Sequence, residues 1–287
     1  MWPQLLTNGL MTGFLYGILG TGFAIQWGIG RIINLAYGSF LLMGAYVLFT
    51  LATSFTVNPL VLIIPAGICG FVLGWITYEM IFRLAARRGL LMTLVAGFGL
   101  DLVLVNIMLL IWKADTRTIV VYWARKLLAL GSVRVGMHRL LIAGAGILCV
   151  VCLWAWLKWS RKGKTILALA SNPLAAEIVG IDSRATARLA FSLGGMLAGI
   201  GGALFGMVSS FSPTITGTLL SKVFIVTILG GLGNVWSSLI GGIVLGLAEA
   251  IGSRAIGAAF SEALGLMLML AVLVLRPRGM LGRAFWV

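Results

Sequence analysis

The sequence predicts an all-α protein, a polytopic transmembrane helix bundle with about eight or nine spans. Of its 287 residues, 61% are hydrophobic and only 10% are charged, and the mean hydropathy is +1.11. A soluble domain of this length needs a wetted exterior and cannot hide so much apolar surface. Spans of roughly 20 residues and their turns would fill the chain. We therefore expect residues 1–287 to form a single transmembrane domain, with no room for a soluble domain such as an ATPase.

Apolar segments separated by short polar stretches are the expected spans. The first begins without a charged region or a small-residue cleavage site, which favours a retained helix over a signal peptide. The seventh is short, and Gly230, Gly231 and Gly233 interrupt it, so a half-helix or re-entrant element is the alternative to a full span there. In order, the expected spans are residues 9–29, 32–53, 59–82, 90–112, 139–159, 187–210, 218–232, 235–252 and 257–275.

Small residues recur at every fourth position in the first, sixth and eighth segments. Such rows allow helices to approach closely in lipid, and they indicate a compact bundle with internal helix–helix contacts. The rows are Gly9, Gly13 and Gly17; Gly194, Ala198, Gly202 and Gly206; and Gly242 with Gly246.

Basic residues predict which loops face the cytoplasm, because short cytoplasmic loops carry an excess of Lys and Arg. Clusters follow the third, fifth and ninth segments: Arg83, Arg87 and Arg88; residues 158–164; and Arg276, Arg278 and Arg283. With nine spans, an outside N-terminus and a cytoplasmic C-terminus place all three clusters, and Arg31, on the cytoplasmic side.

The loop at about 113–137 resists this arrangement. It is expected outside, yet its charged residues are Lys113, Arg117, Arg125, Lys126 and Arg134 against Asp115 alone. Either a span nearby is miscounted, or this basic loop meets an acidic extracytoplasmic surface. Residues 119–123 are apolar enough to lie in the membrane interface.

A polar, helix-forming loop at about 160–187 stands out in a chain that is otherwise apolar. Lys158, Arg161, Lys162 and Lys164 precede its core, and Arg184 and Arg188 close it, so it is expected in the cytoplasm. A short cytoplasmic helix between two spans has few uses. We expect it to be a segment on which another cytoplasmic component pushes.

Ionisable side chains inside spans are costly and are often functional. Glu79 lies one helical turn from Arg83, so an ion pair near the interface is expected. Asp101 lies well inside its span without a nearby basic residue and must face protein or water. Glu249 is near a predicted outer end and is expected to be solvated. Asn34, Asn106 and Asn234 carry amides, which can both donate and accept hydrogen bonds. We expect each to bond a neighbouring helix, and binding a polar group of a substrate is the alternative.

The sequence lacks the residue patterns of catalytic and metal-binding sites. No paired carboxylates, His-metal cluster or phosphate loop with a following Lys-Ser/Thr is present, so neither a catalytic residue nor a metal ligand is assigned. Cys149 and Cys152 have the spacing of half a zinc site, but no second ligand pair accompanies them. The net charge is +14, and we expect the basic residues behind it to cap helices and to set the membrane topology. The sequence shows no basic surface interleaved with aromatic residues, which nucleic-acid binding would favour.

Several motifs occur in a familiar order. Residues 33–40 read Ile-Asn-Leu-Ala-Tyr-Gly-Ser-Phe, and Gly44-Ala45-Tyr46 follows. Further motifs are Thr93, Gly97, Gly99 and Asn106; the segment 163–181; Gly230–Asn234; Gly241-Gly242; and Arg276–Met280. Together they resemble the LivH-type permease subunits of the branched-chain amino acid ABC transporter family, over nearly the whole chain. Tyr37 replaces the usual His, and Asp101 and Val105 also depart from the family pattern.

The resemblance implies a type II ABC importer in the bacterial inner (cytoplasmic) membrane. This chain would form half of the translocation path for branched-chain or related amino acids, paired with a longer, LivM-like permease and surrounded by lipid. It would need no cofactor, since two separate cytoplasmic subunits would bind and hydrolyse ATP. A periplasmic substrate-binding protein would deliver the substrate, and the C-terminus would be cytoplasmic.

The resemblance also assigns residues to two sites. The ATPase-coupling residues are Gly163, Ala168, Asn172, Ala175, Ala176, Glu177, Gly180 and Ile181. The candidates for the translocation path are Asn34, Tyr37, Gly38, Asp101 and Asn106. Urea and short-chain amide importers share this architecture, and Asp101 fits an apolar path less well, so an amide substrate is the alternative. A self-contained channel or secondary transporter is a further alternative, but it would need a filter ring or a coupling-ion site.

Overall fold

The computed structural model describes residues 2–30, 32–55, 57–119, 121, 127–130, 133–231, 233, 235–255, 257–276 and 279–280. Arg31, Arg125, Lys126, Asn234, Arg278 and Arg283, for which the sequence analysis stated expectations, lie outside these residues.

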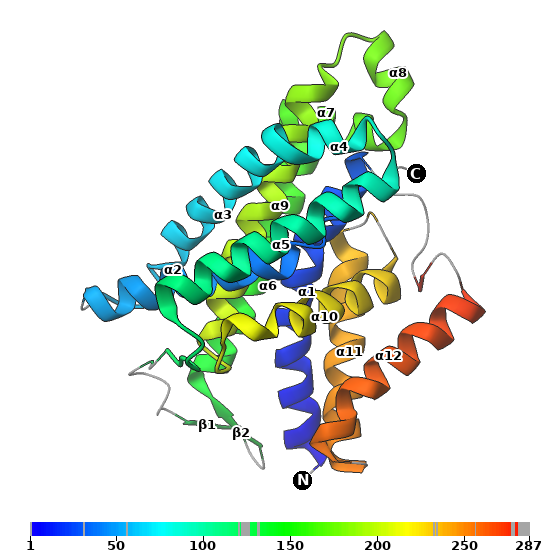
Figure 1. The fold of residues 1–287 in the computed structure, drawn as a ribbon. Coiled ribbons are helices and arrows are strands. Elements are labelled where there is room, and N and C mark those ends of the chain that lie inside the picture. Colours follow the sequence, from blue (N-terminus) through cyan, green and yellow to red (C-terminus); the bar gives the residue numbers. More distant parts are fainter. Residues whose placement is uncertain are drawn as a thin grey trace.

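The described residues form a bundle of long helices, with one small hairpin (Figure 1). The helices before the hairpin are α1 (Trp2–Gly30), α2 (Tyr37–Ser54), α3 (Ile63–Thr77), the π-helical turn η1 (Tyr78–Phe82), α4 (Arg83–Ala86) and α5 (Leu90–Trp112). Those after it are α6 (Met137–Trp159), α7 (Arg161–Ser171), α8 (Pro173–Ile178), α9 (Ser183–Gly206), the 3-10 turn η3 (Pro213–Ile215), α10 (Thr216–Gly230), α11 (Val235–Ala255) and α12 (Ala258–Leu275).

Every expected span overlaps one of these helices. In the described part of the chain, 7 helical segments are long and apolar enough to cross a membrane, and they correspond to the second through eighth expected spans. The first and ninth correspond to α1, whose apolar face is diluted by Gly and polar residues, and to α12, whose apolar run Phe260–Leu275 is shorter. The seventh is a continuous helix, α10, and the preceding turn η3 extends it to the length of a span. The all-α, multi-pass architecture is therefore confirmed.

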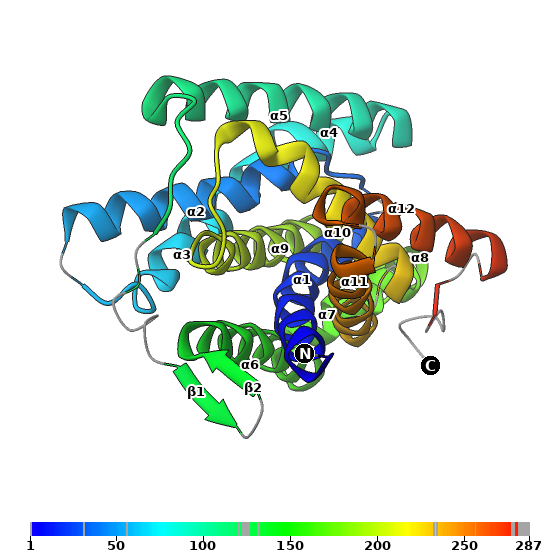
Figure 2. The same ribbon diagram turned by 90° about the horizontal axis from the view of Figure 1, so that it is seen from below.

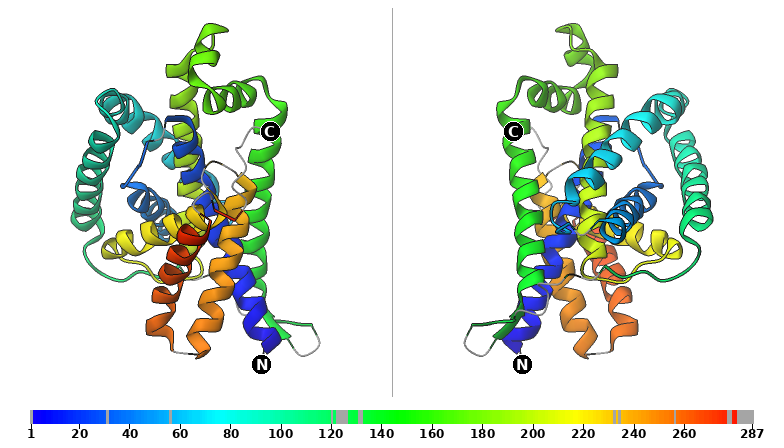
Figure 3. Two further views of the ribbon diagram at one scale, coloured as in Figure 1. Left: turned by 90° about the vertical axis from the view of Figure 1, so that its right-hand side faces the viewer. Right: turned by 90° about the vertical axis from the view of Figure 1, so that its left-hand side faces the viewer.

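The chain has two distinct ends. Helices α7 and α8 lie with α4 at one end, which we call the α8 end, and the N-terminus lies with the hairpin at the other (Figures 1 and 3). The hairpin pairs β1 (Leu127–Leu130) with β2 (Val133–Gly136) in antiparallel register, and the sequence analysis did not predict it. Its place opposite the α8 end argues against a miscounted span between the two loops. An acidic surface that meets the basic loop 113–137 stays a prediction.

Small residues set the spacing of the central helices. α1 packs along α11, and α9 packs along α2 and α3 (Figure 2). A Cβ at Gly13 would come within 2.6 Å of the Ile243 Cα, and a Cβ at Gly202 would overlap the Leu41 carbonyl. These backbones can approach each other only without side chains between them. The expectation drawn from the glycine rows is confirmed for both pairs.

The outer helices present apolar side chains to the surroundings. α5 exposes Leu91 and Leu110 among others, and α3 exposes Ile64 and Ile68. Apolar faces of this extent suit lipid or another membrane subunit, because either surrounding is as apolar as the side chains themselves.

Candidate coupling site at the α7–α8 segment

Helix α7 turns sharply away from the end of α6. Ser160 caps α7 by accepting a hydrogen bond at its Oγ from the Gly163 backbone N–H, 2.8 Å. A Cβ at Gly163 would come within 2.5 Å of the Leu157 Cα and 2.6 Å of the Trp156 carbonyl oxygen. Gly163 is thus required by the close packing of this corner, and its role there is structural.

Helix α8 is short, and both of its ends are capped. Asn172 ends α7 and caps α8, accepting at Oδ1 from the Ala175 N–H at 3.1 Å, and Pro173 takes the first helical position. At the other end Gly180 has φ +83°, and the Ile181 N–H bonds the Ala176 carbonyl at 3.0 Å. This pattern is a Schellman motif, which a glycine at that position favours. The cap residues explain why six residues hold a helix outside the bundle.

The exposed face of α8 is apolar. Leu174, Ile178 and Val179 expose 72%, 78% and 75% of their surface. We call these three residues the α8 ridge. Sequence analysis did not select them, although Leu174 and Ile178 stand four residues apart on a short helix, which puts them on one face. An apolar ridge exposed on a short helix outside the bundle is typical of a protein contact.

The expected coupling residues lie along α7, α8 and the turn that follows α8. Gly163 and Ala176 are buried, Ala168 and Ile181 are half-buried, and Asn172, Ala175, Glu177 and Gly180 are exposed. Residues 172–181 lie together at α8, whereas Gly163 lies at the α6–α7 corner, against Trp156 and Leu157. The role of the expected coupling residues in coupling to an ATPase stays a prediction.

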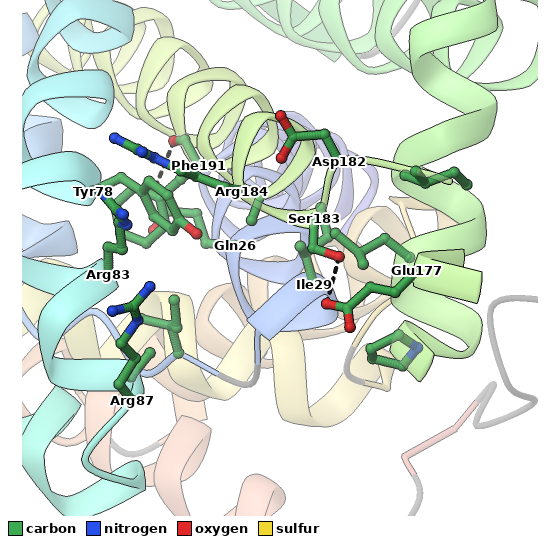
Figure 4. A pocket seen from close by; sticks show the side chains of 16 residues that line it. Gln26, Ile29, Tyr78, Arg83, Arg87, Glu177, Asp182, Ser183, Arg184 and Phe191 are labelled. Atoms are coloured by element: carbon green, nitrogen blue, oxygen red, sulfur yellow. Dashed lines mark hydrogen bonds between the residues drawn. The ribbon is translucent and has the colours of Figure 1, made fainter. Parts of the chain in front are cut away.

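A groove of about 580 Å³ lies behind α8, between it and the end of α3 through α4 (Figure 4). Arg83 and Arg87 stand on one side, and Glu177 and Asp182 stand on the other. The Ser183 Oγ donates to Glu177 Oε1 at 2.8 Å, which ties α8 to the first turn of α9.

Glu79 connects this region to α3. It sits in the π-helical turn η1 and pairs with Arg83, as the sequence analysis expected. Arg184 also contacts its Oε1, and the Arg188 Nη1 lies 3.7 Å from its Oε2. Single π turns inside helices are frequent at functional sites. The carboxylate therefore joins the start of α9 to α3 and α4, which spacing along the chain could not reveal.

Among the path candidates, Asn34 and Tyr37 are fully buried at the start of α2. The Asn34 side chain donates to Gln26 Oε1 at 3.1 Å and accepts from the Ala36 N–H at 3.1 Å. The Tyr37 hydroxyl is 3.5 Å from the Gly194 carbonyl oxygen. These bonds hold α2 against α1 and α9, and a role in the path stays a prediction.

Of the other path candidates, Gly38 and Asp101 lie near the start of α2, and Asn106 lies on the exposed face of α5. A Cβ at Gly38 would overlap the Thr216 carbonyl, so Gly38 permits the contact of α2 with α10. Asp101 is half-buried and accepts a hydrogen bond from Ser39, next to this group. Asn106 is exposed on α5 and bonds a carbonyl of its own helix at 2.7 Å. The structure thus places Asp101 beside the start of α2 and Asn106 away from it.

Glu249 is not solvated, and that expectation was wrong. It and Lys222 expose only 14% and 15% of their side chains, and the Lys222 Nζ lies 3.0 Å from Glu249 Oε1. The Tyr16 hydroxyl donates to Glu249 Oε2 at 2.8 Å and accepts from Lys222 at 2.8 Å. Lys222 lies inside the expected span 218–232, so the same signal that singled out Asp101, an ionisable side chain within a span, could have found it. The packing of α10 against α11 brings Lys222 and Glu249 together, and the charges in the loops do not predict this packing.

The comparisons with known proteins cover almost the whole chain. The family model described as "Branched-chain amino acid transport system / permease component" matches residues 5–276. The protein is 25% identical to the high-affinity branched-chain amino acid transport system permease protein LivH of Salmonella typhimurium, over 98% of this chain and 95% of that protein.

Two further relatives have similar extents. Identity to the high-affinity branched-chain amino acid transport system permease protein BraD of Pseudomonas aeruginosa is 26%, over 98% and 95% of the two chains. Identity to a probable branched-chain amino acid transport permease protein LivH of Methanocaldococcus jannaschii is 25%, over 97% and 92%. No solved structure matches this chain.

Proposed function

Because the chain belongs to the family of branched-chain amino acid transport system permease components, we propose that it forms half of the translocation path of an ATP-driven importer. Its substrates are branched-chain or related amino acids, as the names of its relatives suggest. A second, LivM-like permease completes the path, two cytoplasmic subunits hydrolyse ATP, and an extracytoplasmic binding protein delivers the substrate. The complex lies in the bacterial inner membrane.

The α8 ridge carries this proposal. A capped helix that stands outside the bundle and exposes Leu174 and Ile178 is suited to enter a groove on a cytoplasmic partner. Burying one such side chain contributes about 1.5–3 kcal/mol to an interface. The basic residues around it support a cytoplasmic position for the α8 end: Arg83, Arg87, Arg88, Lys158, Arg161, Lys162 and Lys164.

Two polar connections would carry motion from α8 into the bundle. Ser183 binds Glu177, so a displacement of α8 pulls on the start of α9. Arg184 and Arg188 in turn bind Glu79, which belongs to the turn η1 at the end of α3. A push by the ATP-binding subunits would therefore reach α9 and α3 together, and these helices pack closely along their length.

The test replaces Leu174 and Ile178 with Asp and measures co-purification of the ATP-binding subunits. We expect the complex to be lost while membrane insertion is retained. The matched control is Val57→Asp, at a residue that is 45% exposed in the connection between α2 and α3, away from α8. Normal co-purification and normal uptake by the Asp variants would contradict the coupling assignment.

A second variant separates docking from transmission. Glu177→Lys removes the bond to Ser183 but leaves the ridge unchanged. We expect its complexes to form and to hydrolyse ATP, with uptake no longer linked to hydrolysis. Uptake in the normal proportion to hydrolysis would show that this bond transmits nothing.

The substrate is tested by ATP-dependent uptake into proteoliposomes that hold the chain with its partner subunits. The carboxylate of Asp101, beside Ser39, keeps a urea or short-chain amide importer as the second candidate. We expect uptake of labelled leucine. Uptake of labelled urea alone would keep the architecture and assign the chain to the amide branch.

A further inference from the structure

A second groove lies between α3, α7 and α9, and one of its lining residues, Arg188, also contacts Glu79. Its volume is about 320 Å³. Its walls include Trp75 of α3, Lys162 and Thr165 of α7, and Thr186 and Arg188 of α9. We call it the α3–α7–α9 groove.

Two cations line this groove. Lys162 is exposed and makes no ion pair with any described residue. The Arg188 guanidinium lies 5.7 Å from the centre of the Trp75 ring, and its closest carboxylate contact is Glu79 Oε2 at 3.7 Å. None of the described lining residues is acidic, in contrast to the groove behind α8. The local charge therefore favours an anionic ligand.

A hydroxyl group lies beside Lys162 and Arg188 at the cationic end of the groove. The Thr186 hydroxyl has no hydrogen-bond partner in the described part of the chain, although the residue is only 8% exposed. Thr165 lies one turn from Lys162 on the same helix face, but its hydroxyl already donates to the Lys162 carbonyl at 2.8 Å, so Thr186 is the available donor. Two ammonium or guanidinium groups with a hydroxyl donor are a suitable set for the oxygens of a phosphate.

The other end of the groove opens on an apolar helix face. Trp75 is 45% exposed, and Val72 and Ile68, at helical spacing before it, are 45% and 59% exposed. This face belongs to the membrane-spanning segment Ile63–Ala86, so it continues from the charged groove into the hydrocarbon region. The ligand that matches both ends has an anionic headgroup and an acyl chain.

We propose that the α3–α7–α9 groove binds an anionic phospholipid. Lys162, Arg188 and the Thr186 hydroxyl hold the phosphate, and an acyl chain lies along Ile68 and Val72. Basic pockets between transmembrane helices at the membrane surface bind anionic headgroups in this way. An acidic segment of a partner protein would satisfy the cations, but it would leave the exposed apolar strip of α3 uncovered.

The test measures lipid retention by native mass spectrometry on the purified complex, after exchange with vesicles of phosphatidylglycerol or phosphatidylcholine. We expect specific retention of phosphatidylglycerol. Lys162→Gln should reduce it roughly fivefold, the effect of one basic residue beside an anionic lipid. Lys164→Gln is the matched control, because Lys164 is an exposed lysine of the same helix that does not line the groove.

Each other outcome overturns the proposal. Equal retention of the two lipids, or an equal loss in Lys164→Gln, would show that no specific headgroup site exists. Displacement of the lipid by inorganic phosphate at millimolar concentration would assign the groove to a free anion. Thr186→Val provides an independent variant, and retention unchanged in both it and Lys162→Gln would exclude this groove.

Discussion

The Lys222–Glu249 pair gives the sharpest prediction about stability. Both side chains are about six-sevenths buried, at 15% and 14% exposure, and they join α10 to α11 with Tyr16 of α1 between them. Removal of one partner of a buried ion pair leaves an uncompensated charge and costs about 3–5 kcal/mol. We therefore expect Lys222→Met to destabilise the protein by that amount.

The structure also predicts an asymmetry between the two single variants. Without Lys222, Glu249 retains the Tyr16 hydroxyl alone among the described residues. Without Glu249, Lys222 retains that hydroxyl and the Glu262 carboxylate, whose Oε1 is 3.9 Å away. Glu249→Gln should therefore cost less than Lys222→Met. The double variant Lys222→Met/Glu249→Gln should cost less than the sum of the two single variants, because it leaves neither charge of the pair buried alone and the amide at position 249 can still accept from the Tyr16 hydroxyl.

The assay is unfolding of the purified chain in mixed micelles by a titration with SDS, followed by helical circular dichroism. Asp115→Asn is the control, because the Asp115–Arg117 pair has side chains that are 64% and 34% exposed. Exposed pairs contribute at most about 1 kcal/mol. The reasoning is refuted if Lys222→Met behaves like this control, or if the double variant loses the sum of the two single effects.

Three further predictions concern backbone and path. Gly180→Val should lower the free energy of unfolding by about 1–3 kcal/mol because of the φ of +83° alone, since nothing lies within 4 Å of a Cβ there. Thermal unfolding measures this loss. Gly202→Ala should abolish folding because its Cβ would overlap the Leu41 carbonyl, whereas Gly99→Ala, with open space, should be stable; expression and size-exclusion profiles distinguish them. Asp101→Ala should change uptake kinetics more than Asn106→Ala, and equal kinetics in transport assays would return Asp101 to a structural role.

Local features of this protein could be predicted from the sequence. In lipid each backbone polar group must be satisfied within its own segment, so a long apolar run forms a helix whatever its neighbours are. For the same local reason the Glu79–Arg83 pair followed from the spacing of the two residues, and glycine rows predicted close contacts. Glycine at position 180 belonged to a recognised motif, and its φ of +83° explains that choice.

Contacts between helices were decided by the tertiary structure. Glu249 looked solvated from its place near a span end, yet it binds Lys222, 27 residues earlier and on another helix. Arg184 binds Glu79 across 105 residues, and Asp101 finds Ser39 across 62. Such contacts depend on the depth and rotation of each helix. Those are set jointly by the close packing of α1 on α11 and of α9 on α2 and α3, and no single segment contains that information.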